Sequence, residues 1–139
     1  MELRVLIVVG IAVLFVAVLV AARQWVENRR LATINSDAPE FATPGHATVL
    51  YFYTTSCDPC ERIQKPELNR LATNTAHVVV RAIDAVADQP IAKRFRIMTV
   101  PSTVVLNPDG RVLGVNYGVA LQATLLKQIF ADGDALNSR

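Results

Sequence analysis

The chain has very few of the residues from which most protein metal sites are built. Its 139 residues include two cysteines and two histidines. Both cysteines, Cys57 and Cys60, belong to one tetrapeptide, so a zinc site made of two cysteine pairs is excluded. His46 and His77 lie at spacings from this pair that no common zinc motif uses. Covalent chemistry in this chain therefore depends on Cys57 and Cys60.

Charged residues are also sparse, and neither sign dominates. The 14 basic and 12 acidic side chains give a formal net charge of +2. The basic residues are dispersed and are not interleaved with aromatic residues, which excludes the pattern typical of nucleic-acid binding. The sequence therefore predicts no nucleic-acid partner.

Charge and polar side chains are missing altogether from residues 5–22. At about 1.5 Å per residue, a helix of this length spans about 27 Å, close to the hydrocarbon thickness of a bilayer. A helix buried in a soluble core would show a polar face. We therefore predict a transmembrane anchor at residues 1–22, with residues 5–22 in the membrane. A cleaved signal peptide is the alternative, since residues 20–22 resemble a cleavage site, but the apolar run exceeds the usual length of about 7–15 residues.

The sequence gives opposing indications about the side of the membrane that the rest of the chain occupies. Arg23, Arg29 and Arg30 follow the span, and only Arg4 precedes it. The positive-inside rule then places the C-terminal part in the cytoplasm. A single N-terminal span with a very short tail instead commonly keeps that tail inside. We slightly favour the resulting extracytoplasmic placement.

Residues 23–47 are predicted to be a juxtamembrane segment and linker, because proline and glycine interrupt them. Residues 48–134 are predicted to form one domain, in which short apolar runs alternate with helical patterns. The expected strands are residues 48–53, 77–83, 102–106 and 111–117, the expected helices are residues 59–73, 89–96 and 120–131, and residues 107–110 form a hairpin turn. This order predicts an α/β fold with a small mixed sheet flanked by helices. Pro66 should kink or restart the first helix of this domain.

The tetrapeptide Cys57-Asp58-Pro59-Cys60 joins the first predicted strand to the first predicted helix of the domain. At a helix N-terminus, free N–H groups and the helix dipole lower the pKa of a cysteine such as Cys57. Pro59 suits the first turn, where its missing N–H costs little. The thiol of Cys60, one turn on, can attack a mixed disulfide on Cys57 and release a reduced partner. The carboxylate of Asp58 opposes the thiolate, which favours a more reducing dithiol.

Other uses of the cysteine pair stay open at this point. A disulfide between the two cysteines would stabilise the fold little, because the loop that it closes is very short. A two-coordinate copper(I) site would need only the two thiolates. We favour redox exchange over a metal site and over an inert disulfide.

A second signal is Val100-Pro101 at the start of the third predicted strand, where proline is uncommon unless the strand begins there or lies at an edge. Residues 48–131 resemble the thioredoxin family in the strand before the cysteines, in the step of 44 residues from Cys57 to Pro101, in the turn at 107–110 and in the last amphipathic helix. The resemblance implies a thioredoxin-like fold and a cis peptide bond before Pro101. It also implies that main-chain groups of Val100 bind the backbone of a substrate.

Four positions depart from the usual pattern of that family. Ser56 stands where a tryptophan is usual, Asp58 stands where a glycine is usual, and Pro66 falls one position late. Tyr51 occupies the position of a buried acidic residue that, in many relatives, helps to deprotonate the second cysteine. We therefore expect Asp58, Pro59 and Tyr51 to tune the cysteine pair.

Several other residues near these motifs have a simpler interpretation. Tyr51 and Tyr53 alternate with Phe52, which favours core packing over a hydrogen bond near Cys60. We expect Asp84 to serve a turn. The remaining candidates are expected on solvated surfaces or at strand ends: His46, His77, Lys93, Arg94 and Arg96.

Together these features predict a membrane-tethered thiol–disulfide oxidoreductase that reduces protein disulfides, with Cys57 as the nucleophile and Cys60 as the resolving thiol. The expected partners are a disulfide-containing protein and an upstream electron donor, and neither a metal nor another cofactor is expected. The alternative is a non-catalytic binding module of the same fold, which would use the cysteine pair to hold a metal or a protein partner.

Overall fold

The computed structural model describes residues 1–33 and 37–131, and the chain divides into two compact units, Met1–Asn35 and Ser36–Arg139. The first unit is the helix α1 (Glu2–Thr33). Its segment Leu3–Val26 has a mean hydropathy of 3.3, contains no buried residue, and is long and apolar enough to cross a membrane. Length and composition suit both a membrane anchor and a signal sequence.

The second unit is built on a four-stranded sheet with the strand order β2-β1-β3-β4. The strands are β1 (Ala47–Tyr53), β2 (Val78–Asp84), β3 (Ser102–Leu106) and β4 (Val112–Tyr117). β1 runs parallel to β2 and antiparallel to β3, and β4 is antiparallel to β3. The sheet is therefore mixed, as the sequence predicts. Its two central strands, β1 and β3, are almost entirely buried because helices cover both of their faces.

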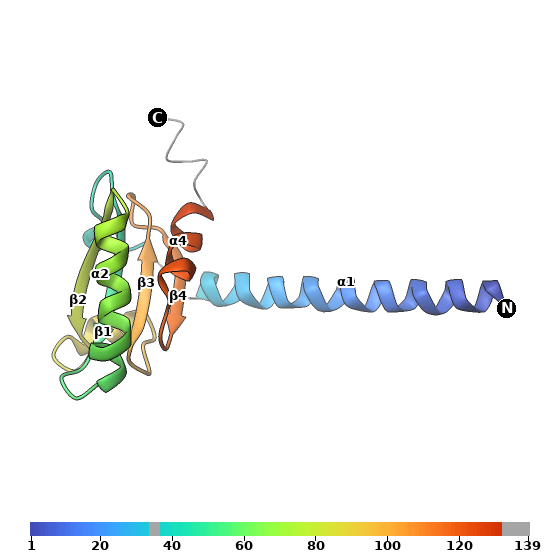
Figure 1. Ribbon diagram of the computed structural model, residues 1–139, viewed down its shortest axis with the longest axis horizontal. Coiled ribbons are helices and arrows are strands. Elements are labelled where there is room, and N and C mark those ends of the chain that lie inside the picture. The colour runs from blue at the N-terminus through green and yellow to red at the C-terminus, as the bar shows by residue number, and fades with distance from the viewer. Residues whose placement is uncertain (34–36, 132–139) are drawn as a thin grey trace. The chain divides into compact units, whose positions relative to one another are not determined.

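The longer helices, α2 (Lys65–Asn74) and α4 (Gln122–Ala131), pack together on one face of the sheet (Figure 1). Alternate residues of β1, among them Val49 and Tyr51, face these helices and meet Leu68 and Leu71 of α2. Cys60 belongs to the same buried cluster. The principal core thus lies directly beneath the cysteine pair.

The opposite face of β1 is covered by α3 (Gln89–Arg94) and by the short 3-10 helix η1 (Pro39–Phe41). Phe95, at the end of α3, contacts the rings of Phe52 and Phe41, each with a centroid separation of 6.0 Å. The guanidinium of Arg94 pairs with the carboxylate of Glu40. The folded unit therefore includes part of the segment 23–47 that the sequence analysis assigned to the linker.

Two turns form as their polar residues predict. Asp84 ends β2, and its carboxylate accepts hydrogen bonds from the N–H groups of Val86 and Ala87 at 2.9 and 3.1 Å. Asn107 follows β3, and its side-chain oxygen accepts from the N–H groups of Asp109 and Arg111 at 3.0 and 2.9 Å. Short polar side chains stabilise such turns by replacing backbone acceptors.

The helix after the cysteines differs from the uniform α-helix expected at residues 59–73. Helical backbone begins at Asp58, passes through a π-helical segment, η2 (Cys60–Gln64), and continues as α2. In η2 the N–H of Lys65 bonds the carbonyl of Cys60, five residues earlier instead of four. Pro66 lies in the first turn of α2, where its missing N–H is tolerated. The predicted restart at Pro66 is confirmed. Compared with the family pattern, one more residue separates Cys57 from Pro66, and the wider π turn accommodates it.

Candidate functional site

Cys57 and Cys60 lie beyond the C-terminal end of β1 and are joined by a disulfide with an S–S distance of 2.07 Å. Cys60 is completely buried, whereas Cys57 is only partly covered. Because β1 is held on both sides by β2 and β3, the strand fixes the start of the loop that carries Cys57. Cys57 is therefore the more exposed of the two cysteines, and Cys60 is covered by the core.

The backbone around the disulfide directs the N–H of Cys60 toward the sulfur of Cys57. The N–H of Cys60 points at Sγ of Cys57 over 3.2 Å. The carbonyl of Cys57 accepts the first helical hydrogen bond, from the N–H of Glu61 at 3.4 Å, which makes Cys57 the N-cap of the helix. When the disulfide is reduced, N–H donors and the positive end of the helix dipole both favour a thiolate at this sulfur.

The carboxylate of Asp58 is partly neutralised by a residue that the sequence analysis missed. Nε of Arg62 lies 2.8 Å from Oδ1 of Asp58, one helical turn away, and both side chains are largely exposed. An exposed pair of this kind is weak and is screened by salt. It nevertheless offsets the repulsion between Asp58 and a thiolate at Cys57. Opposite charges at positions i and i+4 were the signal that could have identified Arg62.

Tyr51 does more than pack in the core. Its side chain is buried, and its hydroxyl donates a hydrogen bond to the carbonyl of Cys60 at 3.1 Å. Burial raises the pKa of Tyr51 to about 12, and the negative charge of Glu61 adds to this effect. The ring stacks on Tyr53 at a centroid separation of 5.6 Å. The preference for packing alone was therefore wrong for Tyr51.

Val100 and Pro101 lie at the same end of the sheet as the cysteines, and the peptide bond between them is cis, as the resemblance implies. Pro101 is buried and directly precedes Ser102, which pairs with Phe52 of β1. Val100 is partly buried and packs, like Cys57, against the core cluster. The antiparallel pairing of β1 with β3 thus brings Pro101 to the strand end from which the cysteine loop departs.

A buried glutamine connects the helix of Cys60 to the loop after β4. Gln64 has no exposed surface, and its amide bonds both backbone groups of Ala120. The carbonyl of Ala120 accepts from Nε2 of Gln64 at 3.0 Å, and the N–H of Ala120 donates to Oε1 at 2.8 Å. Gln64 was not among the predicted site residues, although its position four residues after Cys60 and four before Leu68 places it on the buried stripe of the helix.

The remaining candidate residues stay outside the site. Lys93 and Arg96 are exposed, and Arg94 stacks near the rings of Phe41 and Phe95, so this basic group serves packing and solvation. His46 and His77 precede β1 and β2, with ring centroids 5.3 Å apart. Neither histidine lies near the cysteines. The histidines precede the N-terminal ends of β1 and β2, whereas the cysteines follow the C-terminal end of β1.

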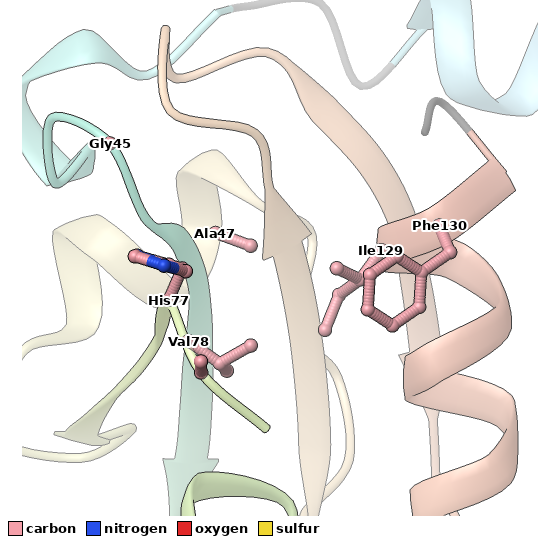
Figure 2. Close-up of a pocket in the computed structure, with 7 residues that line it drawn as sticks. Gly45, Ala47, His77, Val78, Ile129 and Phe130 are labelled. Atoms are coloured by element: carbon pink, nitrogen blue, oxygen red, sulfur yellow. The ribbon is translucent and has the colours of Figure 1, made fainter. Parts of the chain in front are cut away.

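A cavity of about 390 Å³ lies at the far end of the sheet, between the starts of β1 and β2 and the end of α4. Figure 2 shows His77 and Val78 on one side of it and Ile129 and Phe130 on the other. The cysteines follow the opposite end of β1, so this cavity is separate from the disulfide. Within the described ranges 1–33 and 37–131, no three side chains among His, Cys, Asp and Glu gather as metal ligands would.

Comparison with known proteins supports the interpretation drawn from the geometry. A family model described as Thioredoxin matches residues 36–131. A thioredoxin from Echinococcus granulosus is 28% identical over 87 residues, which cover 60% of this chain and 80% of the relative. Mitochondrial thioredoxin 3 from Saccharomyces cerevisiae, in its oxidised form, is 26% identical, with a TM-score of 0.57 over 66% of this chain and 83% of the relative. Fasciola hepatica thioredoxin shares the fold at 23% identity and a TM-score of 0.55, over 63% and 82% of the two chains.

Proposed function

Because the chain belongs to the thioredoxin family, we propose that it reduces protein disulfides by dithiol exchange while tethered to a membrane. The family and the Cys57–Cys60 pair support thiol–disulfide oxidoreductase activity in general. The observation that carries the proposal is the asymmetry of the pair. Cys57 is accessible at a helix N-cap with an N–H aimed at its sulfur, and Cys60 is buried within bonding distance behind it.

The proposed reaction consists of two exchanges. The Cys57 thiolate attacks one sulfur of a partner disulfide, so that a mixed disulfide forms and the first partner thiolate leaves. The Cys60 thiolate then attacks Sγ of Cys57, which forms the Cys57–Cys60 disulfide and releases the second partner thiolate. Two electrons pass to the partner, and the two protons lost by the dithiol balance those taken up by the partner thiols. An upstream dithiol donor must then reduce the pair again.

The surroundings of the pair suit an extended, largely apolar protein segment. The loops after β2 and β4 and the loop before β3 all lie at the sheet end that carries the cysteines, because of the strand directions. These loops expose Val86, Met98 and Val119, and the last residue of β4, Tyr117, is exposed as well. Main-chain groups of Val100, next to Pro101, would bind the backbone of such a segment. Exposed apolar side chains that gather around a reactive group are typical of protein-binding surfaces.

The experiment follows insulin disulfide reduction by the full chain in detergent micelles, with dithiothreitol as the electron source. We expect the wild type to accelerate the reaction and Cys57→Ser to lower the rate to that of dithiothreitol alone, because serine cannot form the mixed disulfide. Equal rates for the wild type and Cys57→Ser would contradict the proposal and favour the binding module. Thermal unfolding of both proteins serves as the control for whether the substitution leaves the fold intact.

Membrane tethering is a separate part of the proposal and has its own test. The apolar segment Leu3–Val26 supports it. In cells that produce the full chain, we expect the protein to resist alkaline carbonate extraction and to dissolve only in detergent. After mild reduction, a membrane-impermeant thiol reagent should label Cys57 in intact cells if the domain is extracytoplasmic. Release by carbonate would contradict the anchor, and protection of Cys57 until lysis would contradict the orientation.

A further inference from the structure

The backbone carbonyl of Cys60 has a side-chain hydrogen-bond partner in addition to its helical one. The carbonyl of Cys60 accepts two donors, the N–H of Lys65 across the π turn and the hydroxyl of Tyr51 at 3.1 Å. Apart from its disulfide to Cys60, Cys57 is bonded within the described residues to backbone groups, with its N–H donating to the carbonyl of Thr54 at 3.2 Å. A single tyrosine therefore ties the resolving cysteine to the sheet.

Tyr51 is well suited to act as a fixed anchor. It lies in the centre of the sheet, where its backbone pairs with Ala82 on one side and with Thr103 on the other. Its ring is buried and stacks on Tyr53. A carbonyl oxygen can only accept, so the hydroxyl hydrogen must point to Cys60. With its pKa raised to about 12, the hydroxyl keeps this hydrogen at neutral pH.

The π turn explains why such an anchor matters here. A turn closed over five residues is an irregular, uncommon form of helix, and η2 begins at Cys60 itself. The attack of Cys60 on a mixed disulfide requires its sulfur to reach Sγ of Cys57 in line with the bond that breaks. The helix alone gives Cys60 one hydrogen bond across this wide turn, and Tyr51 gives the second.

We propose that Tyr51 is a positioning residue for the second exchange, holding the Cys60 backbone so that its sulfur resolves the mixed disulfide. This inference rests on the proposed function and assigns Tyr51 to one half of it. The first exchange depends on Cys57 and on the N–H of residue 60 that points at its sulfur, and it does not use the Tyr51 hydroxyl. Loss of the hydroxyl should therefore slow one step and spare the other.

The test measures the two exchanges separately in the full chain in detergent micelles. The first exchange is followed in a Cys60→Ser background, with an aromatic disulfide that releases a coloured thiolate. The second is followed in the reduced dithiol chain, where acid quenching and mass measurement record the decay of the mixed disulfide. Each is repeated with Tyr51→Phe and with Tyr53→Phe, the matched control, and thermal unfolding verifies the fold of every variant.

We expect Tyr51→Phe to slow decay of the mixed disulfide about three- to tenfold, the effect of one lost hydrogen bond, with the first exchange changed by less than about twofold. Tyr53→Phe should leave both steps unchanged. Normal decay in Tyr51→Phe, or equal slowing of both steps, would overturn the inference while leaving the proposed function in place. If Cys57 fails to attack the probe even with Tyr51 present, the proposed function fails, and this inference fails with it.

Discussion

Cys60→Ser is expected to abolish turnover and to trap the partner on Cys57. The substitution keeps the volume of the buried side chain close to the original, and Cys57 keeps its exposure, its N-cap position and the N–H of residue 60. The first exchange therefore proceeds, whereas a serine hydroxyl cannot displace a thiolate from the mixed disulfide. Insulin reduction should fall close to the rate of dithiothreitol alone. When the reduced variant is freed of dithiothreitol and mixed with insulin, a covalent complex should accumulate on a non-reducing gel.

The matched control is the chain in which both cysteines are replaced by serine. It should form no covalent complex, and any complex made by Cys60→Ser should disappear when excess dithiothreitol is added. Insulin reduction by Cys60→Ser at the wild-type rate would show that the Cys60 thiol is not needed to resolve the mixed disulfide. A complex that forms equally in the double variant would show that attachment does not involve Cys57.

Gly110→Ala is expected to have the largest effect on stability. Gly110 has a φ of +89°, and a Cβ at this position would lie 2.6 Å from Cα of Pro39. Its carbonyl accepts the N–H of Ala38 at 2.7 Å, so the β3–β4 turn and the segment before η1 are tightly joined. Positive φ costs an alanine about 1–2 kcal/mol, and the overlap adds about 1–3 kcal/mol. The free energy of unfolding should fall by about 2–5 kcal/mol, and the melting temperature by at least about 10 °C.

Gly45→Ala isolates the contribution of the backbone conformation. Gly45 also has a positive φ, +75°, but nothing lies within 4 Å of its added Cβ. Denaturant unfolding should therefore show a loss of only about 1–2 kcal/mol for this variant. Equal losses for the two variants would show that the close approach of Gly110 to Pro39 does not matter for folding.

The sequence predicted the fold well because local signals agreed with one another. Apolar runs of strand length marked all four strands, and Asp84 and Asn107 marked turns that their side chains do form. The resemblance to thioredoxins added the cis peptide bond before Pro101, which apolar periodicity cannot reveal. The bounds of the elements were predicted to within a few residues.

The parts of the site that were missed depend on contacts between distant segments or on irregular backbone. The clamp between Gln64 and Ala120 joins residues 56 positions apart. The hydrogen bond from Tyr51 to Cys60 depends on a π turn, and helix propensity scales do not distinguish a π turn from an α turn. One sign of the π turn was present in the sequence, because Pro66 falls one position late in the family pattern. The late proline alone does not predict how the backbone changes.

The most direct test of the account counts thiols in the chain during a single turnover. Because Cys57 and Cys60 are the only cysteines, alkylation after acid quenching reports this pair alone. The reduced chain is mixed with excess insulin in the absence of dithiothreitol, and mass spectrometry follows the alkyl groups on the chain. We predict that the number of alkyl groups on the chain falls from two to none while two insulin thiols appear. The prediction would be contradicted if insulin thiols appeared while both cysteines could still be alkylated, or if no exchange took place.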